Sequence, residues 1–226
     1  MGETLRILLV DDEPLIRSGL AAILSLEKDL DVVGEADDGR EVWSQVRRLQ
    51  PNLVMMDVRM PQMNGIEATA QLVANSGLLP HAPRILILTT FESDDYVYDA
   101  LKAGAHGFLL KRSQPEELIQ TVRAVARGES IVFPSKLRQL VADRQRHGGV
   151  AGNDVVGSAG LSARENEVLQ NLARGYNNQE IAERMFLGVE TVKSHIASIL
   201  TKLGVRDRTQ AVIAAYESGF ILPGAR

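Results

Sequence analysis

Four short apolar runs in the first half of the chain each end in polar residues that could act together. These residues are Asp11 with Asp12, Asp57, Thr89 and Lys111. If the runs are parallel strands, their carboxyl ends meet at one edge of a sheet, which is where such sheets bind ligands. Three carboxylates in one place repel each other, and a hard divalent cation bound through oxygen atoms neutralises them. The pattern therefore predicts a site that binds Mg²⁺ and handles phosphate.

The metal ligands and the nucleophile can be assigned within this set. Asp57 ends the central one of five runs, and beside a metal ion its carboxylate can act as a nucleophile toward a phosphoryl donor. We expect Asp12 to bind the metal directly. Asp11 is expected to bind it through a water molecule, or to contact the direct ligands without binding the metal itself. The backbone carbonyl of Arg59 can add a further ligand.

Two further residues can interact with the oxygen atoms of a phosphoryl group. Lys111 offers a positive charge, and the hydroxyl of Thr89 offers a hydrogen bond. Taken singly, a polar residue at the end of a strand often serves only to solvate a loop or to form an ion pair. Four strand ends that each supply a suitable group favour a phosphate-handling site, with Asp57, Lys111 and Thr89 as its reactive residues.

The elements that would position these residues alternate along the first 127 residues. Apolar runs of strand character are interleaved with amphipathic stretches at helical spacing, which is the rhythm of repeated βα units. The runs cover residues 5–10, 32–36, 53–56, 85–88 and 107–110, and the helical segments lie near residues 14–26, 39–49, 65–75, 94–103 and 115–127. The sequence predicts a doubly wound, flavodoxin-like α/β domain on a five-stranded parallel sheet.

The rest of the chain has a different character. Residues 128–160 lose the alternation and include five glycines from position 148 onward, which is typical of a flexible linker. Residues 161–226 carry helical signals throughout. We therefore expect three parts: a sheet domain over 1–127, a linker over 128–160, and an all-α four-helix domain over 161–226.

Local signals place the four helices of the last domain. Ser162 and Glu165 form a capping box at the start of the first helix, and Asn177 can cap the second. Gly188 is an acceptable cap for the third helix. The fourth covers about residues 209–218, and its apolar side chains suit a dimer contact or the core of the bundle equally well.

The third helix of this domain has one apolar face and one polar face. The polar face combines a cation, hydroxyls and a small residue, which suits a helix that lies in a major groove. The residues expected to contact bases or phosphates are Thr191, Lys193, Ser194, Ala197, Thr201, Lys202, Arg206 and Arg208. A single helix of this kind is more often a solvated surface than a reader of DNA, so the interpretation depends on the wider motif.

Composition favours an intracellular protein. The 226 residues include no cysteine, carry a net charge of −4 and are 45% hydrophobic. No apolar run approaches the ~20 residues that span a bilayer, and the chain opens without a basic leader. The first 126 residues hold 12 Lys and Arg against 19 Asp and Glu, whereas residues 161–226 hold 8 against 7. We expect a cytoplasmic protein without a membrane partner. The difference in charge balance also indicates that the two halves have different functions.

The motifs of the first half resemble the receiver domain of two-component response regulators. The stretches Leu-Leu-Val-Asp-Asp-Glu, Met-Asp-Val-Arg-Met-Pro and Gly-Phe-Leu-Leu-Lys occur in that family's order, and the resemblance covers residues 5–127. It implies that Asp57 accepts a phosphoryl group from a sensor histidine kinase and that Thr89 and Phe108 form a switch. Thr89 would move to bond the phosphoryl group and leave space for the ring of Phe108.

The motifs of residues 161–221 resemble the LuxR-type helix-turn-helix domain. They are Leu-Ser-Ala-Arg-Glu, Asn-Gln-Glu-Ile-Ala and Thr-Val-Lys-Ser-His. Together the two resemblances imply a response regulator of the NarL/FixJ type. Such a protein would bind double-stranded DNA, and phosphorylation would control its DNA binding and its assembly into a homodimer.

Other functions fit the pattern less well. A Mg²⁺-dependent phosphohydrolase with an aspartate nucleophile commonly needs a second Asp two residues later, and Arg59 stands there. A P-loop nucleotide hydrolase is excluded because the sequence has no Gly-x-x-x-x-Gly-Lys-Ser/Thr. A scaffold that works without phosphorylation would not need the intact acidic set. The sequence thus predicts a transcription regulator that is not an enzyme, with phosphoacceptor and self-dephosphorylation chemistry only.

Overall fold

The computed structural model describes residues 4–90, 94–128 and 155–221. The chain divides into two compact units, residues 1–131 and 132–226, and each unit is described by itself. Most of the predicted linker, residues 129–154, lies outside the described residues.

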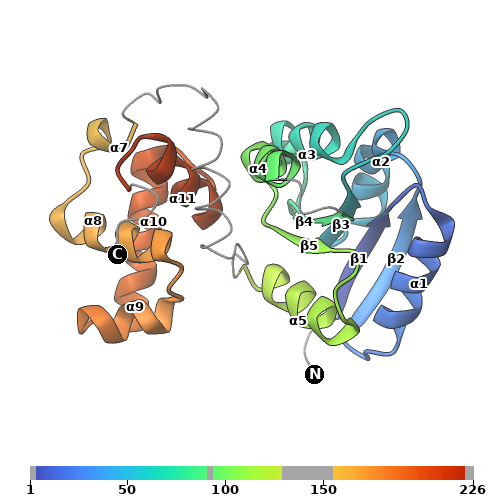
Figure 1. The fold of residues 1–226 in the computed structure, drawn as a ribbon, viewed down its shortest axis with the longest axis horizontal. Helices are drawn as coiled ribbons and strands as arrows, with labels where there is room; N and C mark the ends of the chain where they lie inside the picture. The colour runs from blue at the N-terminus through green and yellow to red at the C-terminus, as the bar shows by residue number, and fades with distance from the viewer. Residues whose placement is uncertain (1–3, 91–93, 129–154, 222–226) are drawn as a thin grey trace. The chain divides into compact units, whose positions relative to one another are not determined.

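The first unit is a five-stranded parallel sheet with helices on both faces (Figure 1). The strands are β1 (Leu5–Val10), β2 (Leu30–Ala36), β3 (Leu53–Asp57), β4 (Arg84–Thr89) and β5 (Gly107–Leu110). The helices are α1 (Pro14–Ser25), α2 (Gly39–Leu49), α3 (Gly65–Ala74), α4 (Asp94–Ala103) and α5 (Pro115–Ala126), with a short 3-10 helix η1 (Ser76–Leu78). The strand order β2-β1-β3-β4-β5 confirms the predicted flavodoxin-like sheet.

Helices cover both faces of this sheet, which explains why its strands are apolar runs without alternation. One face packs against α1 and α5 through a cluster that includes Ile7, Leu9, Met55, Leu24 and Val122. Figure 1 shows α2, α3 and α4 on the opposite side. Successive residues of a strand point to opposite faces, so both faces of β1 are buried.

The topology brings the predicted site residues to one edge of the sheet. β3 lies in the centre, between β1 and β4. Val10 pairs with Met56, so Asp11 and Asp57 follow at equivalent positions of neighbouring strands. Thr89 pairs with Leu110, and the backbone amide of Lys111 donates to the carbonyl of Thr89 at 2.8 Å. The carboxyl ends of four strand runs therefore converge, as the sequence predicts.

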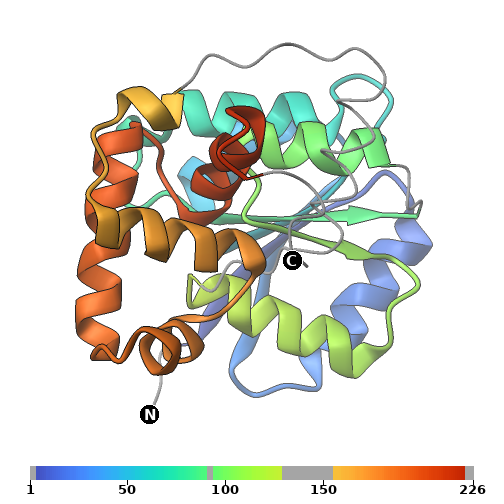
Figure 2. The same ribbon diagram turned by 60° about the vertical axis from the view of Figure 1, so that its left-hand side comes forward.

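The second unit is entirely helical in its described part, which confirms the predicted all-α architecture (Figure 2, yellow to red). Its helices are α7 (Val155–Ser158), α8 (Ala163–Arg174), α9 (Asn178–Met185), α10 (Val189–Leu203) and α11 (Arg208–Glu217). The short helix α7 falls within the range that the sequence suggested as linker. It contacts α11 and buries the side chain of Val156, so the folded part of this unit begins before residue 161.

The caps and the core of the second unit follow from local signals. Ser162 and Glu165 form the predicted capping box at α8, and α10 begins directly after Gly188. Five apolar residues of α11 are buried: Ala211, Val212, Ile213, Ala215 and Tyr216. The hydroxyl of Tyr216 donates to the carbonyl of Ala173 at 3.0 Å. Of the two alternatives for this helix, the structure therefore supports the core of the bundle.

Candidate functional site

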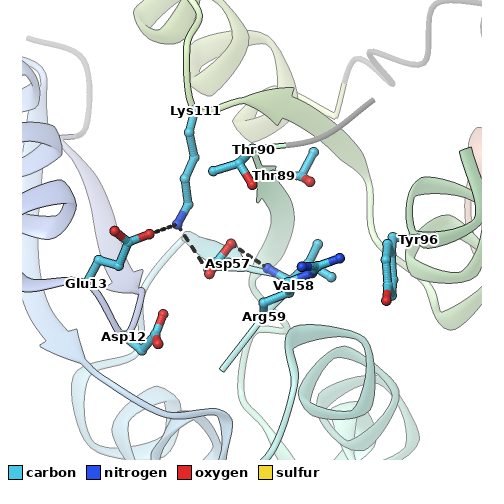
Figure 3. A pocket seen from close by; sticks show the side chains of 9 residues that line it. All are labelled: Asp12, Glu13, Asp57, Val58, Arg59, Thr89, Thr90, Tyr96 and Lys111. Atoms are coloured by element: carbon cyan, nitrogen blue, oxygen red, sulfur yellow. Dashed lines mark hydrogen bonds and ion pairs between the residues drawn. The ribbon is translucent and has the colours of Figure 1, made fainter. Parts of the chain in front are cut away.

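A pocket of about 280 Å³ opens at the carboxyl edge of the sheet (Figure 3). Its walls come from the ends of β1, β3, β4 and β5 and from the first turns of α4. The lining residues are Asp12, Glu13, Asp57, Val58, Arg59, Thr89, Thr90, Tyr96 and Lys111. The structure thus brings together Asp12, Asp57, Thr89 and Lys111, which are distant from each other in the sequence.

One ammonium group faces three carboxylates at this pocket. Lys111 Nζ lies 2.7 Å from Asp11 Oδ2, 3.2 Å from Asp57 Oδ2 and 3.6 Å from Glu13 Oε1. The side chains of Lys111, Asp11 and Asp57 are buried, whereas Glu13 is exposed. Asp57 Oδ1 also accepts a hydrogen bond from the amide of Val58 at 2.8 Å. Asp57 Oδ2 and its ammonium partner therefore lie at the pocket, and the other carboxylate oxygen is held by the backbone.

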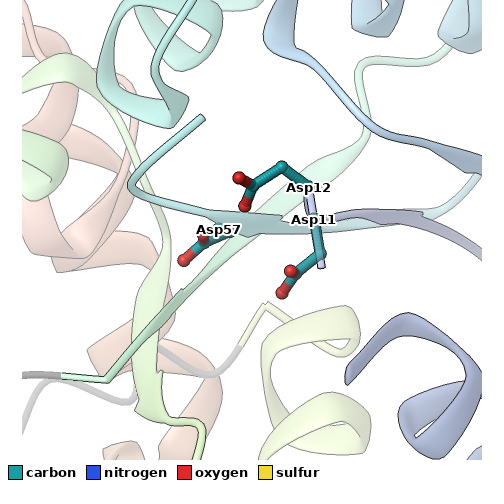
Figure 4. Close-up of side chains that lie close together, drawn as sticks. All are labelled: Asp11, Asp12 and Asp57. Carbon is teal, nitrogen blue, oxygen red and sulfur yellow. The ribbon is translucent and has the colours of Figure 1, made fainter. Parts of the chain in front are cut away.

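Three carboxylates at or beside the pocket could share a metal ion. Asp11, Asp12 and Asp57 each offer one oxygen atom, and these atoms lie within 4.8 Å of one another (Figure 4). Mg²⁺ prefers six oxygen ligands at about 2.1 Å, so ligands on opposite sides of the ion stand about 4 Å apart. Asp11 Oδ2 is buried, and the Lys111 ammonium lies 2.7 Å from it. The donor set and its spacing fit a small, hard cation.

The crowding of these groups shifts their proton affinities. Burial raises the pKa of Asp57 to about 6, the negative charge of Asp11 raises it as well, and the ammonium of Lys111 offsets part of the rise. Burial alone would lower the pKa of Lys111, but its contacts with Asp11 and Asp57 outweigh burial and raise it. At neutral pH the site therefore holds a charged lysine and an Asp57 carboxylate that a cation would stabilise further.

The two residues of the expected switch lie on one face of the sheet. Phe108 of β5 pairs with Ile87 of β4, and Thr89 is two residues further along the same strand. Partners in register and residues two apart point to the same face, so Thr89 and Phe108 are diagonal neighbours. Both side chains are buried.

Glycine is required directly behind the pocket. The amide of Gly65 donates to the carbonyl of Val58 at 2.9 Å, and a Cβ atom at position 65 would lie 2.0 Å from the carbonyl oxygen of Asp57. No side chain fits at that distance. The start of α3 therefore packs against the backbone of the central aspartate only because residue 65 lacks a side chain.

We expect Gly65→Ala to lower the free energy of unfolding by about 1–3 kcal/mol, since Asp57 or α3 must move. It should also slow phosphorylation of Asp57. Gly19→Ala is the matched control, because a Cβ atom there meets nothing within 4 Å, and in the interior of α1 alanine should stabilise by about 0.5–1 kcal/mol. Urea unfolding followed by circular dichroism measures both; a Gly65→Ala protein as stable as wild type would contradict the prediction.

Some residues of the pocket were not anticipated from the sequence. Glu13 belongs to the acidic run after β1, and its position there was the available signal. Tyr96 belongs to α4, and its ring centroid lies 5.2 Å from the guanidinium carbon of Arg59. No local motif marks this tyrosine, because its place at the pocket depends on how α4 packs.

The predicted DNA-contacting face of α10 is exposed. Thr191, Lys193, Ser194, Ala197 and Thr201 all have exposed side chains. Lys193 pairs with Glu190 at 2.7 Å, one turn earlier on the same helix, and both side chains are exposed. An exposed pair of this kind contributes little to stability and can be exchanged for a phosphate or a base.

Three basic residues near the end of α10 differ in their surroundings. Arg206 is exposed. Lys202 Nζ lies 2.7 Å from Glu165 Oε2, and Arg208 donates to Asn178 Oδ1 at 3.2 Å and to the carbonyl of Tyr176. Burial lowers the pKa of Arg208 to about 10. Lys202 and Arg208 thus have partners within the protein, and their contacts with phosphates stay predictions.

Glu165 joins α8 to α10. Its side chain accepts from the amide of Ser162 at 2.6 Å, from the hydroxyl of Ser198 at 2.6 Å and from Lys202 at 2.7 Å. The same carboxylate therefore caps one helix and fixes the position of the next. The capping box was visible in the sequence, but its link to α10 was not, because Ser198 is 33 residues away.

In the described part of the chain, no helix is long and apolar enough to cross a membrane.

Comparisons with known proteins match both units. The family model of the response regulator receiver domain matches residues 7–123, and that of the luxR family of bacterial regulatory proteins matches residues 159–215. Transcriptional regulatory protein LiaR of Bacillus subtilis is 40% identical over 217 residues, which cover 96% of this chain and 99% of LiaR. Response regulator protein VraR of Staphylococcus aureus is 38% identical over 218 residues, with 96% and 99% covered.

A solved structure matches nearly the whole chain. The crystal structure of response regulator ChrA, from a heme-sensing two-component system, is 36% identical in sequence with a TM-score of 0.51. The match covers 97% of this chain and all of ChrA. With the two family models and the full-length relatives, it leads to one conclusion: this chain belongs to the two-component response regulators that join a receiver domain to a LuxR-type DNA-binding domain, and it is a transcription factor.

Proposed function

We propose that Asp57 is the residue to which a sensor histidine kinase transfers a phosphoryl group, and that this transfer controls dimerisation and DNA binding. The convergence of Asp11, Asp12, Asp57 and Lys111 at one pocket carries the proposal. We place the protein in the cytoplasm, where DNA and the catalytic part of such a kinase are found together.

The acidic residues would hold Mg²⁺ through the carboxylates of Asp12 and Asp57 and the carbonyl of Arg59, and Asp11 would bind it through water or contact its direct ligands. Bound there, Mg²⁺ supplies positive charge to the carboxylates and to the phosphoryl oxygens. The carboxylate oxygens of Asp11, Asp12 and Asp57, which lie within 4.8 Å of one another, support the proposal of a Mg²⁺ site.

The transfer itself is a displacement at phosphorus. A carboxylate oxygen of Asp57 forms a bond to phosphorus, and the bond from phosphorus to the imidazole nitrogen of the kinase breaks. Lys111 neutralises charge on the phosphoryl oxygens, and the hydroxyl of Thr89 donates a hydrogen bond to one of them. Attack by water on the acyl phosphate later returns inorganic phosphate and the free carboxylate, which is the self-dephosphorylation expected of this site.

The switch would pass this local change to the surface. When Thr89 moves toward the phosphoryl group, the buried ring of Phe108 can occupy the space that it leaves, and the surface formed by α4 and β5 changes. The contacts of the phosphoryl group must favour the active state strongly, since about 5.5 kcal/mol converts a 1:99 population into 99:1.

The exposed face of α10 is the proposed reader of DNA. Thr191, Lys193, Ser194, Ala197 and Thr201 would lie in or beside the major groove, and Lys202, Arg206 and Arg208 would approach phosphates. A homodimer would place two such helices on half-sites about one helical turn apart.

Lys193→Ala should weaken binding to the specific DNA site by about 5- to 100-fold if Lys193 contacts a base. The site is first selected from a random DNA library with the phosphorylated protein, and affinities are then measured by fluorescence anisotropy at several salt concentrations. Lys28→Ala, which removes an exposed lysine from the receiver domain, serves as the control. Unchanged affinity of the Lys193 variant at every salt concentration would remove this residue from the reader.

The same selected DNA can be used to test whether phosphorylation controls DNA binding and dimerisation. Wild-type protein treated with Mg²⁺ and acetyl phosphate should bind it more tightly than untreated protein and should show a dimer mass by light scattering. Addition of EDTA before acetyl phosphate should prevent both changes. Equal affinity and equal mass in all samples, with phosphorylation verified, would show that phosphorylation controls neither property.

A further inference from the structure

Asp38 is a buried carboxylate of the receiver domain that lies outside the pocket lining. Asp38 precedes α2 and is 5% exposed. Its Oδ1 accepts from the amide of Arg40 at 3.1 Å, and its Oδ2 accepts from the amide of Gln62 at 2.9 Å. Arg40 lies in the first turn of α2, whereas Gln62 lies in the loop between β3 and α3. One side chain therefore links two separate connections of the sheet.

The backbone beside Asp38 closes the same junction. The amide of Gly39 donates to the carbonyl of Met63 at 3.2 Å, and a Cβ atom at position 39 would lie 2.5 Å from that oxygen. The close approach requires glycine at this position. Asp38 and Gly39 together hold residues 62–63 by a side-chain and a backbone contact.

The carboxylate of Asp38 is suited to this task because it stays ionised. Burial by itself would raise the pKa of Asp38, but hydrogen bonds from the amides of Arg40, Gln62 and Met63 lower it below its usual value. A carboxylate that accepts several backbone hydrogen bonds is both charged and rigidly placed.

The loop that Asp38 holds is the one that carries part of the proposed site. Residues 58–64 connect Asp57 to the start of α3 and include Arg59, which lines the pocket. The beginning of the loop is tied by the hydrogen bond from Gly65 to Val58. Its other end is tied by Asp38 and Gly39. Both ends of the loop are thus fixed: the amide of Val58 also donates to the carbonyl of Leu88 in β4 at 3.2 Å, and Asp38 and Gly39 hold the far end from the start of α2.

We infer that Asp38 is a positioning residue for the metal site: its carboxylate holds the β3–α3 loop so that the backbone after Asp57 is preorganised for a divalent cation. The inference rests on the proposed metal ligands Asp57 and Arg59. Removal of an outer contact that orients metal ligands commonly costs 10- to 100-fold in metal affinity, so the effect should be measurable.

The variant Asp38→Asn separates this role from helix capping. Asparagine is as good a cap as aspartate, so its side-chain oxygen can still accept from Arg40 and α2 should remain intact. Its amide nitrogen would then face the amide of Gln62, where two donors meet and no hydrogen bond forms. Asp38→Ser is a second variant that keeps a capping hydroxyl but is too short to serve both loops.

The first measurement needs no metal. Hydrogen–deuterium exchange of the full-length apo protein should show faster exchange in residues 58–64 for both variants, with little change in β1 and α5. Asp29→Asn is the control, since Asp29 pairs with Arg123 at 2.8 Å at the far end of β2. Unchanged exchange in the loop would overturn the inference.

The second measurement is the affinity for Mg²⁺, by calorimetric titration of the same proteins. We expect about a tenfold weaker affinity for Asp38→Asn and an unchanged affinity for Asp29→Asn. If the loop loosens while the Mg²⁺ affinity stays at the wild-type value, Asp38 does not position the metal site. If wild type itself binds no Mg²⁺, the proposed metal ligands are wrong, and the exchange data alone decide whether Asp38 holds the loop.

Discussion

Asp57→Ala is expected to abolish the phosphoryl adduct that wild type acquires from Mg²⁺ and acetyl phosphate. The substitution removes the carboxylate that ends the central strand of the sheet and leaves the others in place. Intact-mass spectrometry at a pH above about 7 reads the result directly, because the pKa of Asp57 near 6 leaves its carboxylate ionised there. Wild type should gain the mass of one phosphoryl group and the variant none.

The variant should also remain folded. Asp57 is one of several carboxylates around a single ammonium, so its removal relieves repulsion in the absence of metal. Asp31→Ala, at an exposed position of β2, is the matched control and should be labelled like wild type. A fully labelled Asp57→Ala protein would refute the assignment of the phosphoacceptor. A folded wild type without any adduct would mean that this receiver does not accept small phosphodonors.

Glu165→Gln should destabilise the DNA-binding domain by about 2–3 kcal/mol. The carboxylate accepts one hydrogen bond as a cap and two more from Ser198 and Lys202, and hydrogen bonds to charged groups contribute about 1.5–3 kcal/mol. Because Ser198 and Lys202 belong to α10, the variant should also bind the selected DNA more weakly. Calorimetric unfolding of the full chain reports the transition of this domain.

The pH dependence tests the same contact with a defined sign. Hydrogen bonds from Lys202, Ser198 and Ser162 hold the pKa of Glu165 well below its usual value of 4.5. Its stabilising effect is therefore fully present above that usual value and is lost as the pH falls below it. The difference in stability between wild type and Glu165→Gln should shrink from pH 6 to pH 3.

Glu167→Gln is the control for this prediction. Glu167 lies on the same helix, but its pair with Arg164 is exposed and should contribute less than about 1 kcal/mol. Identical unfolding of the Glu165 and Glu167 variants at pH 6 would show that the link between α8 and α10 does not stabilise the domain.

Much of the fold follows from local order along the chain. The alternation of apolar runs and amphipathic stretches predicts all five strands and all five helices of the receiver domain, with ends within two residues of those observed. The period of two in strands and 3.6 in helices depends only on neighbouring residues, so it is visible without a structure. The polar residues at the strand ends then meet because parallel strands share a carboxyl edge.

Contacts between segments that are distant in the chain could not be predicted from these local sequence patterns. The partner of Lys202 is a cap 37 residues earlier, and the support of the β3–α3 loop comes from Asp38, 24 residues before Gln62. Tyr96 reaches the pocket only through the packing of α4. Whether the apolar residues of α11 form core or a dimer face depended likewise on α8 and α10, which cover them.

The physical reason for this division is the range of the interactions. Strand and helix periods, caps and turns are set by neighbours in the chain, whereas the choice among possible ion pairs depends on which side chains the folded backbone brings within about 4 Å. A surface lysine and a lysine bound to a buried glutamate look alike in sequence. Lys193 and Lys202 differ only in the surroundings that tertiary packing provides: Lys193 pairs within its own exposed helix face, and Lys202 pairs with the buried cap of another helix.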